Sequence, residues 1–390
     1  MLAFPRLGLL ALASLGVVAF ACSSSSSDDD GTLPETDGGS VDTGTTFDAT
    51  TPNDGAAPAI DAGPPEDVHF LGRFDTSDPK GPRFAYPGST IGTSFTGTGI
   101  AVTLADQGDD YFTVVVDDGK PTALHTSGTQ SYVLVQGLAT GTHTVTIAKR
   151  TESFQGIVQF QGFAPIDGAI VPTPFPFTRK IEMIGDSITC GYGDLGAGPS
   201  CHFSADTEDE TQAWGAVAAA SLGAMHTAIS YSGKGVFRNN DGSTTDLMPE
   251  IWTRTFADDS TSTWDFTKYV PDVVVVNLAT NDFSKGDPGN DFITAYGAFL
   301  NVLRTKYPSA HLVGVIGTML GEPQHTTALG YVQAAVKAAN DGGDAKVTAL
   351  DLGIQDQDAD GIGCDYHPSV ATQAKMGAKL AAHVKTIIGW

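Results

Sequence analysis

The sequence predicts two domains, a jelly-roll-like all-β sandwich followed by a three-layer α/β domain with a parallel sheet. Residues 68–165 contain short runs in which β-branched residues alternate with polar ones between glycine turns, a pattern typical of an antiparallel sandwich. After residue 179, apolar strand-like runs alternate with helix-like stretches. This alternation indicates right-handed βαβ units and a sheet covered on both faces.

The size and charge of the chain agree with this organisation and exclude one class of partner. With 390 residues, the chain is long enough for two domains that each bury a core. Its net charge is −24, and only 17% of its residues are charged. Nucleic-acid binding requires a basic surface, so we expect no nucleic-acid partner.

The first 21 residues have the features of an export signal. Arg6 supplies a positive charge, and residues 7–21 form an apolar run that ends in small residues, too short and wrongly flanked for a spanning helix. Cys22 and the serines after it resemble a bacterial lipoprotein signal, although Ala19 stands where leucine is usual. We therefore expect a cell-envelope lipoprotein with lipid on Cys22, or a secreted protein if the signal is simply cleaved.

Residues 22–66 predict a disordered tether. After Cys22 this stretch consists mainly of Ser, Thr, Gly, Pro, Ala and Asp, with acidic residues, no basic residue and almost no large apolar side chain. Such a segment cannot bury enough surface to offset the entropy lost on ordering. We expect the β domain at residues 67–170, a stiff proline-rich linker at 171–178, and the α/β domain at 179–390.

Local signals place individual elements in both domains. In the β domain, Val116–Lys120 (VDDGK) predicts a hairpin, because Asp-Gly suits a type I′ turn. In the α/β domain, the apolar residues of 292–303 recur with helical spacing, and residues 372–388 form a closing helix. The strand-like runs are Ile181–Ile184, Ala224–Ser230, Asp272–Leu278, Leu312–Ile316 and Val347–Leu350.

Three cysteines follow Cys22, and an exported protein can keep a disulfide between two of them. They are Cys190, Cys201 and Cys364, and their odd number leaves one thiol over. A Cys190–Cys201 bridge would close a short loop and is the pairing that we favour. A pairing with Cys364 stays open.

Polar residues follow the predicted strands at the edge where parallel sheets bind ligands. Among them are a hydroxyl, a glycine-rich loop, an amide and a histidine, which are the parts that acyl transfer requires. Each alone has a simpler interpretation as a helix cap, a turn or a structural histidine. Together, in order and each at a strand end, they favour a catalytic site. The segments are Gly185–Ser187, Ser230–Gly235, Ala279–Asp282 and Gly363–Ser369.

These segments resemble the blocks of the SGNH (GDSL-type) hydrolases. Longer stretches, such as RKIEMIGDSITCGYG, WDFTKYVPDVVVVNLATNDFS and GCDYHPSVATQAKM, resemble carbohydrate esterase family 2, whose members deacetylate plant polysaccharides. The resemblance covers residues 179–390 and implies a flavodoxin-like α/β domain. The family also carries an N-terminal β-sandwich, which matches residues 68–165.

The resemblance assigns a role to each residue at the strand ends. Ser187 is the nucleophile, and His367 takes its proton and returns one to the leaving oxygen. The backbone N–H groups of Ser187 and Gly233 and the side chain of Asn281 form the oxyanion hole, with Gly235 as the competing glycine. We expect Asp186, by contrast, to shape its turn through side-chain-to-backbone hydrogen bonds.

The sequence departs from the common SGNH pattern around the histidine. Cys364 occupies the usual position of the acidic triad member, three residues before His367. Asp365 is one residue nearer, and we expect its side chain to point away from the imidazole. The resemblance therefore implies a Ser–His dyad, oriented by a backbone carbonyl, in which Asp365 and Tyr366 bind the sugar. Tyr366 stands where a tryptophan is common and offers a shallower platform.

A second departure is Ala279, which stands where the family has glycine. Alanine tolerates that turn only if its φ is negative, so we expect a small energetic cost.

The segment Asp356–Gly361 (DQDADG) matches the first positions of an EF-hand calcium loop. However, His367 stands where the loop requires a bidentate glutamate, and no helix precedes it. We expect a polar loop that presents His367, and neither a metal nor a cofactor for the reaction.

The function expected is that of an exported esterase that removes acetyl groups from xylan, mannan or a related polysaccharide. A lipase or aryl esterase of the same superfamily is the alternative, but it would need an apolar acyl groove. A third possibility is a non-catalytic surface glycan-binding lipoprotein, which loss of Ser187 or His367 would favour; both are present. The sequence leaves the oligomeric state open.

Overall fold

The computed structural model describes residues 67–173 and 178–390. The expected signal peptide, the tether, Cys22 and part of the linker lie outside these ranges. In the described part of the chain, no helix is both long enough and apolar enough to cross a membrane.

The N-terminal domain is antiparallel β-structure, as predicted. The runs expected as separate strands between residues 99 and 149 merge into two long strands that pair with each other. Phe112 in one of them pairs with both Leu124 and Lys149, so the sheet curves around a core that contains Phe84, Phe95 and Ile147. The strands are β1 (His69–Leu71), β2 (Arg83–Phe84), β3 (Thr90–Val116), β4 (Thr122–Lys149), β5 (Val158–Ile166) and β6 (Ile170–Val171).

The hairpin predicted at Val116–Lys120 joins β3 to β4, but its turn differs from the prediction. The N–H of Gly119 donates to the carbonyl of Val116 at 3.0 Å, and the positive φ falls on Asp117, at +51°. A type I′ turn centred on Asp118 and Gly119 would need positive φ at both, and neither has it. The prediction of type I′ geometry is therefore wrong.

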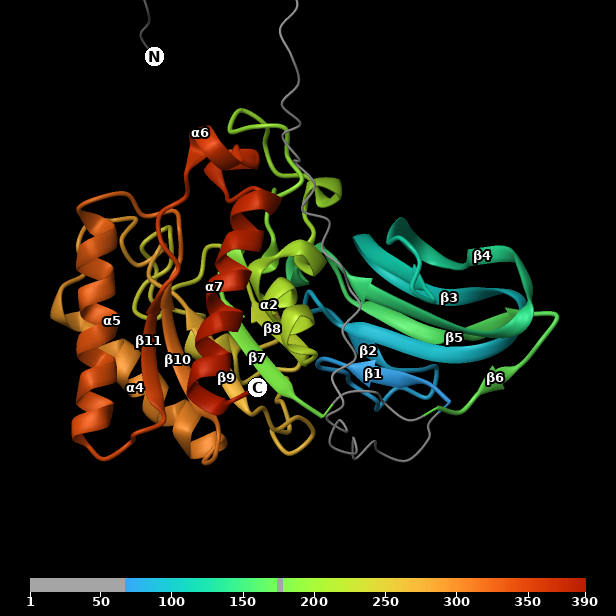
Figure 1. Cartoon of the computed structure of the whole chain (residues 1–390), viewed down its shortest axis with the longest axis horizontal. Helices are drawn as coiled ribbons and strands as arrows, with labels where there is room; N and C mark the ends of the chain where they lie inside the picture. Colours follow the sequence, from blue (N-terminus) through green and yellow to red (C-terminus); the bar gives the residue numbers. More distant parts are fainter. Residues whose placement is uncertain (1–66, 174–177) are drawn as a thin grey trace, which may run out of the picture. The chain divides into compact units, whose positions relative to one another are not determined.

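The C-terminal domain contains the predicted parallel sheet. Its strand order is β11-β10-β9-β7-β8, and all recorded pairings are parallel. Every residue of the central β9 is buried, as expected for a strand covered on both faces. The strands are β7 (Lys180–Gly185), β8 (Met225–Ser230), β9 (Val273–Asn277), β10 (His311–Ile316) and β11 (Val347–Asp351) (Figure 1).

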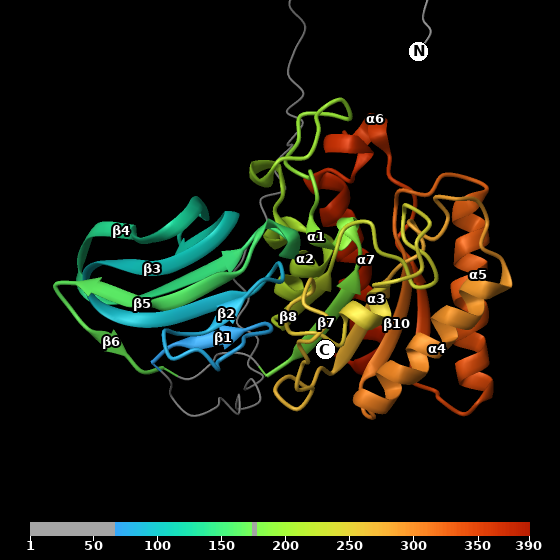
Figure 2. The same ribbon diagram turned by 180° about the vertical axis from the view of Figure 1, so that it is seen from behind.

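Helices cover both faces of this sheet and complete the three layers (Figures 1 and 2). Helix α7 (Val370–Ile388) packs with α2 (Trp214–Leu222) on one face through residues such as Leu380 and Trp214. On the other face lie α4 (Asn290–Lys306) and α5 (Gln324–Asp341), with Phe292 and Val332 in their core. Short helices occupy loops: α1 (Ser187–Cys190), α3 (Met248–Ile251) and α6 (Gln357–Asp360).

Buried polar contacts join the β domain to the α/β domain. Arg73 donates through Nη1 to the carbonyl oxygens of Trp252 and Arg254, at 2.5 and 2.7 Å, and it pairs with the buried Glu182 at 3.6 Å. The Tyr86 hydroxyl donates to the carbonyl of Ile251 at 3.0 Å. Because these hydrogen bonds and this ion pair form only across the interface, they fix the position of one domain relative to the other.

Candidate active site

Ser187 lies at the carboxyl end of β7, where it opens α1. The residue before it, Asp186, is the N-cap and accepts a hydrogen bond from the N–H of Ile188 at 3.1 Å. This confirms that Asp186 shapes the turn. Burial raises the pKa of Asp186 to about 7. Near neutral pH the carboxyl beside the serine is therefore only partly ionised.

His367 lies within hydrogen-bonding distance of Ser187, although 180 residues separate them. The Ser187 hydroxyl and the Nε2 atom of His367 are 2.8 Å apart, and Nδ1 is 3.3 Å from the carbonyl oxygen of Cys364. A carbonyl can only accept, so Nδ1 carries the proton and Nε2 is free to accept one from Ser187. Burial lowers the pKa of His367 to about 4, which keeps the imidazole neutral at neutral pH, with Nε2 available to accept a proton.

The carboxylate of Asp365 points away from the imidazole. It accepts hydrogen bonds from the Tyr192 hydroxyl at 3.0 Å and the Phe203 N–H at 2.9 Å, and it pairs with His202 at 2.9 Å. Among the described residues, Nδ1 of His367 bonds to the Cys364 carbonyl and to no carboxylate. The arrangement is that of a Ser–His dyad, and the role of Asp365 as a sugar ligand stays a prediction.

The chain just before His367 adopts an unfavourable backbone conformation. Asp365 and Tyr366 have φ angles of +50° and +66°, in the left-handed region that costs non-glycine residues about 1–3 kcal/mol each. This conformation brings the Cys364 carbonyl back to Nδ1 of His367. Tyr366 itself is 59% exposed, so its aromatic side chain can meet a ligand.

Two backbone N–H groups near Ser187 are free to stabilise an oxyanion. In the described part of the chain, the N–H groups of Ser187 and Gly233 donate to no residue. The N–H of Gly235, by contrast, donates to the side-chain oxygen of Asn239 at 3.3 Å. Gly233 also has a φ of +79°, which favours glycine. Between the two glycines, the geometry favours Gly233.

Asn281 contacts the same loop through its side chain. Its Nδ2 atom donates to the carbonyl of Lys234 at 2.8 Å and to Asp186 at 3.2 Å. Both amide hydrogens are therefore used in this state, and donation to an oxyanion would require one of these bonds to give way. The next residue, Asp282, accepts from the N–H groups of Val236, Phe237 and Arg238.

Two predictions near the site are wrong. Ala279 has a φ of +154° rather than a negative one, so the turn keeps the geometry that suits glycine. The methyl group is instead buried in the apolar core, and the packing overrides the local preference. The disulfide joins Cys201 to Cys364, not Cys190 to Cys201, and Cys190 is a buried free thiol.

The disulfide and the contacts of Asp365 link the histidine segment to the loop that precedes α2. The N–H of Asp365 also donates to the carbonyl of Cys201 at 3.0 Å. Against this segment lies Tyr192, whose ring is 4.1 Å from that of His367 between centroids. Sequence reasoning missed Tyr192 and His202; the GYG that follows Ser187 was the one available signal for an aromatic side chain at this place.

A polar pocket of about 250 Å³ lies beside the loop that follows β8 and contains Gly233. Its lining carries hydroxyl, amide, ammonium and carboxylate groups but few apolar atoms. Such a surface suits a hydroxyl-rich ligand better than an acyl chain. The lining residues are Tyr231, Ser232, Gly233, Lys234, Asn239, Asn240, Asp241 and Ser243.

The acidic segment Asp356–Gly361 forms no grouping that could hold a metal among the described residues. Asp356 caps α6 by accepting from the Ala359 N–H at 3.0 Å, and Asp360 pairs with Lys375 at 2.5 Å. In residues 67–173 and 178–390, the grouping of metal-binding side-chain types consists of Glu152, Cys190 and Glu208.

Models of two protein families match the chain. The carbohydrate esterase 2 N-terminal family matches residues 70–174. The GDSL-like lipase/acylhydrolase family matches residues 183–375, a range that contains both Ser187 and His367.

Among curated proteins, the chain is 38% identical over 325 residues to the cellulase/esterase CelE of Acetivibrio thermocellus, covering 83% of this chain and 40% of that protein. It is 26% identical to an acetylxylan esterase/glucomannan deacetylase of Cellvibrio japonicus, covering 83% and 89% of the two chains. Among solved structures, a family two carbohydrate esterase from Clostridium thermocellum in complex with cellohexaose is 39% identical. That match has a TM-score of 0.80 and covers 83% of this chain and 99% of the other.

The depressed pKa of His367 predicts activity that persists in acid. The base must be neutral to accept the Ser187 proton, and burial favours the neutral form down to a pKa of about 4. We expect kcat/KM for an aryl acetate to stay constant as the pH falls from neutral, and to decline only near pH 4. Circular dichroism at each pH serves as the control for unfolding. A decline centred near 6.5, the ordinary histidine value, would contradict this assignment.

The contacts of Asp365 predict a limited effect of Asp365→Asn on the chemical step. An amide oxygen can still accept from Phe203 and Tyr192, and no carboxylate–imidazole bond is lost. We expect kcat for an aryl acetate to fall by roughly tenfold or less, whereas Ser187→Ala removes the nucleophile and lowers kcat by about 10³-fold or more. Equal losses of kcat in the two variants would show that Asp365 is the acidic member of a catalytic triad.

Proposed function

Because the chain belongs to carbohydrate esterase family 2 and is therefore a carboxylic ester hydrolase, we propose that it removes O-acetyl groups from plant-type polysaccharides such as xylan or mannan. The observation that carries the proposal is the 2.8 Å approach of the Ser187 hydroxyl to Nε2 of His367, beside two unused backbone N–H groups. This is the geometry of a serine nucleophile with its base.

In the proposed mechanism, Ser187 Oγ attacks the acetyl carbonyl carbon while Nε2 of His367 takes the hydroxyl proton. The developing oxyanion accepts hydrogen bonds from the N–H groups of Ser187 and Gly233, and from Asn281 if it releases a present acceptor. The imidazolium then donates its proton to the sugar oxygen, which leaves as a hydroxyl, and Ser187 carries the acetyl group. Water, deprotonated by His367, then attacks this ester, and the imidazolium returns the proton to Ser187 Oγ as acetate is released.

A polysaccharide substrate is supported by the chemistry around Ser187 and by the relatives. The pocket beside Gly233 is lined by polar groups such as Lys234 and Asn239, and the exposed Tyr366 ring offers a face for a sugar. One curated relative is named an acetylxylan esterase/glucomannan deacetylase, and the similar solved structure was determined in complex with cellohexaose.

We further propose that the protein acts outside the cytoplasm as a lipoprotein of the cell envelope. The support is the apolar run of residues 7–21 followed by Cys22 and a serine stretch. Lipid on Cys22 and the acidic tether after it would hold the enzyme at the surface, with reach toward an insoluble glycan.

The substrate is tested by measuring acetate release from acetylated xylan, acetylated glucomannan and a long-chain aryl ester. We expect release from at least one glycan, abolished in Ser187→Ala and unchanged in Ser309→Ala, a control at an exposed serine in the loop before β10. Hydrolysis of the long-chain ester alone would favour a lipase or aryl esterase. No release from any substrate would favour a glycan-binding protein without catalytic function.

The location is tested by expressing the full chain in a bacterium and fractionating the cells. We expect the wild-type protein in the membrane fraction, labelled by a clickable fatty acid, and Cys22→Ser in the soluble exported fraction without label. Cys190→Ser is the matched control, since that thiol is buried in the folded enzyme. Export of unlabelled wild-type protein would show that the signal is simply cleaved.

A further inference from the structure

We propose that Glu152, a residue of the β domain, is a positioning residue that holds the oxyanion loop and the nucleophile helix in their catalytic arrangement. The oxyanion loop is defined here as residues 231–235, which follow β8. This inference rests on the proposed function, because it assigns Glu152 a part in the same site.

The first support is the contact of Glu152 with the loop itself. Its carboxylate accepts two hydrogen bonds from Ser232, one from the backbone N–H at 2.7 Å and one from the hydroxyl. Ser232 directly precedes Gly233, the candidate oxyanion donor, whose backbone has a φ of +79°. The Gly233 N–H belongs to the peptide bond that follows Ser232, so a displacement of Ser232 moves this donor directly.

The second support is the contact of Glu152 with the helix that begins at the nucleophile. The thiol of Cys190 lies 3.6 Å from Oε2 of Glu152 and donates to it, and it also lies 3.2 Å from the Ser230 hydroxyl. Cys190 is the last residue of α1, which starts at Ser187. The Glu152 carboxylate thus contacts both α1 and the loop that contains Gly233. These two segments must be correctly placed relative to each other for Ser187 and Gly233 to act on the same carbonyl.

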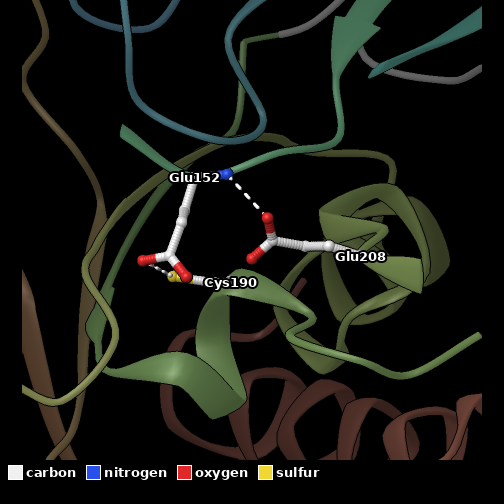
Figure 3. A group of neighbouring side chains, drawn as sticks. All are labelled: Glu152, Cys190 and Glu208. Carbon is white, nitrogen blue, oxygen red and sulfur yellow. Dashed lines mark hydrogen bonds between the residues drawn. The ribbon is translucent and has the colours of Figure 1, made fainter. Parts of the chain in front are cut away.

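Glu208 holds Glu152 from the other side (Figure 3). The backbone N–H of Glu152 donates to Oε2 of Glu208 at 2.9 Å, and both residues are fully buried. Burial and the neighbouring Glu152 charge hold the pKa of Glu208 well above its usual range. Burial raises the pKa of Glu152 as well, but its hydrogen bonds from Ser232 oppose that shift. Within the pair, Glu208 is therefore the carboxyl that holds a proton more readily.

The same three side chains, Glu152, Cys190 and Glu208, are of types that bind metal ions, and their ligand atoms lie within 4.8 Å of one another. However, both oxygens of Glu152 already accept hydrogen bonds from Ser232 and Cys190. A metal would have to break the contacts that hold the loop. A proton on Glu208 relieves the repulsion without that cost, so positioning explains the cluster better than metal binding.

The inference predicts a loss of turnover in Glu152→Ala that Glu152→Gln largely restores. Alanine frees the loop, and misplacing catalytic groups by about 1 Å costs up to roughly a hundredfold in rate. We expect kcat for an aryl acetate to fall about ten- to a hundredfold with KM changed less than about twofold, because oxyanion contacts act on the transition state. The glutamine amide can still accept from the Ser232 N–H and donate to its hydroxyl oxygen.

Two further variants separate positioning from simple loss of stability. Tyr86→Phe removes another buried hydrogen bond between the domains, the one to the Ile251 carbonyl at 3.0 Å, and should lower the melting temperature without lowering kcat. Ser232→Ala, at a half-buried position, removes only the hydroxyl contact and should lower kcat modestly while the fold is kept. It decides the question if Glu152→Ala does not fold.

A covalent probe makes the test independent of the natural substrate. A fluorophosphonate labels Ser187 by a reaction whose phosphoryl oxygen occupies the oxyanion hole, so its second-order rate reports the same geometry. We expect slower labelling in Glu152→Ala and Ser232→Ala, and wild-type rates in Tyr86→Phe. The wild type could release no acetate while the Glu152→Ala and Ser232→Ala variants are still labelled more slowly than it. That result would support the inference and reject only the proposed substrate. Wild-type kcat and labelling in folded Glu152→Ala, or in Ser232→Ala where Glu152→Ala does not fold, would overturn the inference.

Discussion

Catalysis in this enzyme requires that one loop, residues 231–239, is held in position. The loop has no regular secondary structure of its own. Three buried side chains hold it: Glu152 at Ser232, Asn281 at the Lys234 carbonyl, and Asp282 at the N–H groups that follow. Glu152 comes from the β domain, and Asn281 and Asp282 come from the segment that follows β9. An oxyanion hole is effective only when its donors are in place before the reaction, and these contacts supply that order.

The histidine is held by different means, and these account for its low pKa. A backbone carbonyl, that of Cys364, faces Nδ1 of His367 at 3.3 Å, where many serine hydrolases have a carboxylate. A carbonyl dipole favours the imidazolium less than a full negative charge would, so burial determines the direction of the pKa shift. The Cys201–Cys364 disulfide and the left-handed backbone at Asp365 and Tyr366 keep that carbonyl in position.

The sequence could predict features that follow from periodicity and parallel topology. Because parallel strands present their carboxyl ends at one edge, the order of Ser187, Asn281 and His367 along the chain was enough to expect them together. Features decided by tertiary packing could not be predicted. The φ of Ala279, the partner of Cys364 and the contact of Glu152 with Ser232 each depend on residues distant in sequence, and no local pattern distinguishes them.

The energetics of the Glu152 cluster argue that it is kept for geometry rather than for stability. Placing two carboxyl groups and a thiol in a fully buried site is costly, and apolar residues of similar volume often serve stability as well or better. The Cys190 thiol has its pKa raised well above the usual value by burial, so it acts as a neutral hydrogen-bond donor and not as a nucleophile. What apolar side chains could not do is accept two hydrogen bonds from Ser232 while reaching across a domain boundary. The β domain therefore belongs to the catalytic unit, because the carboxylate of Glu152 fixes the position of the oxyanion donor relative to the nucleophile.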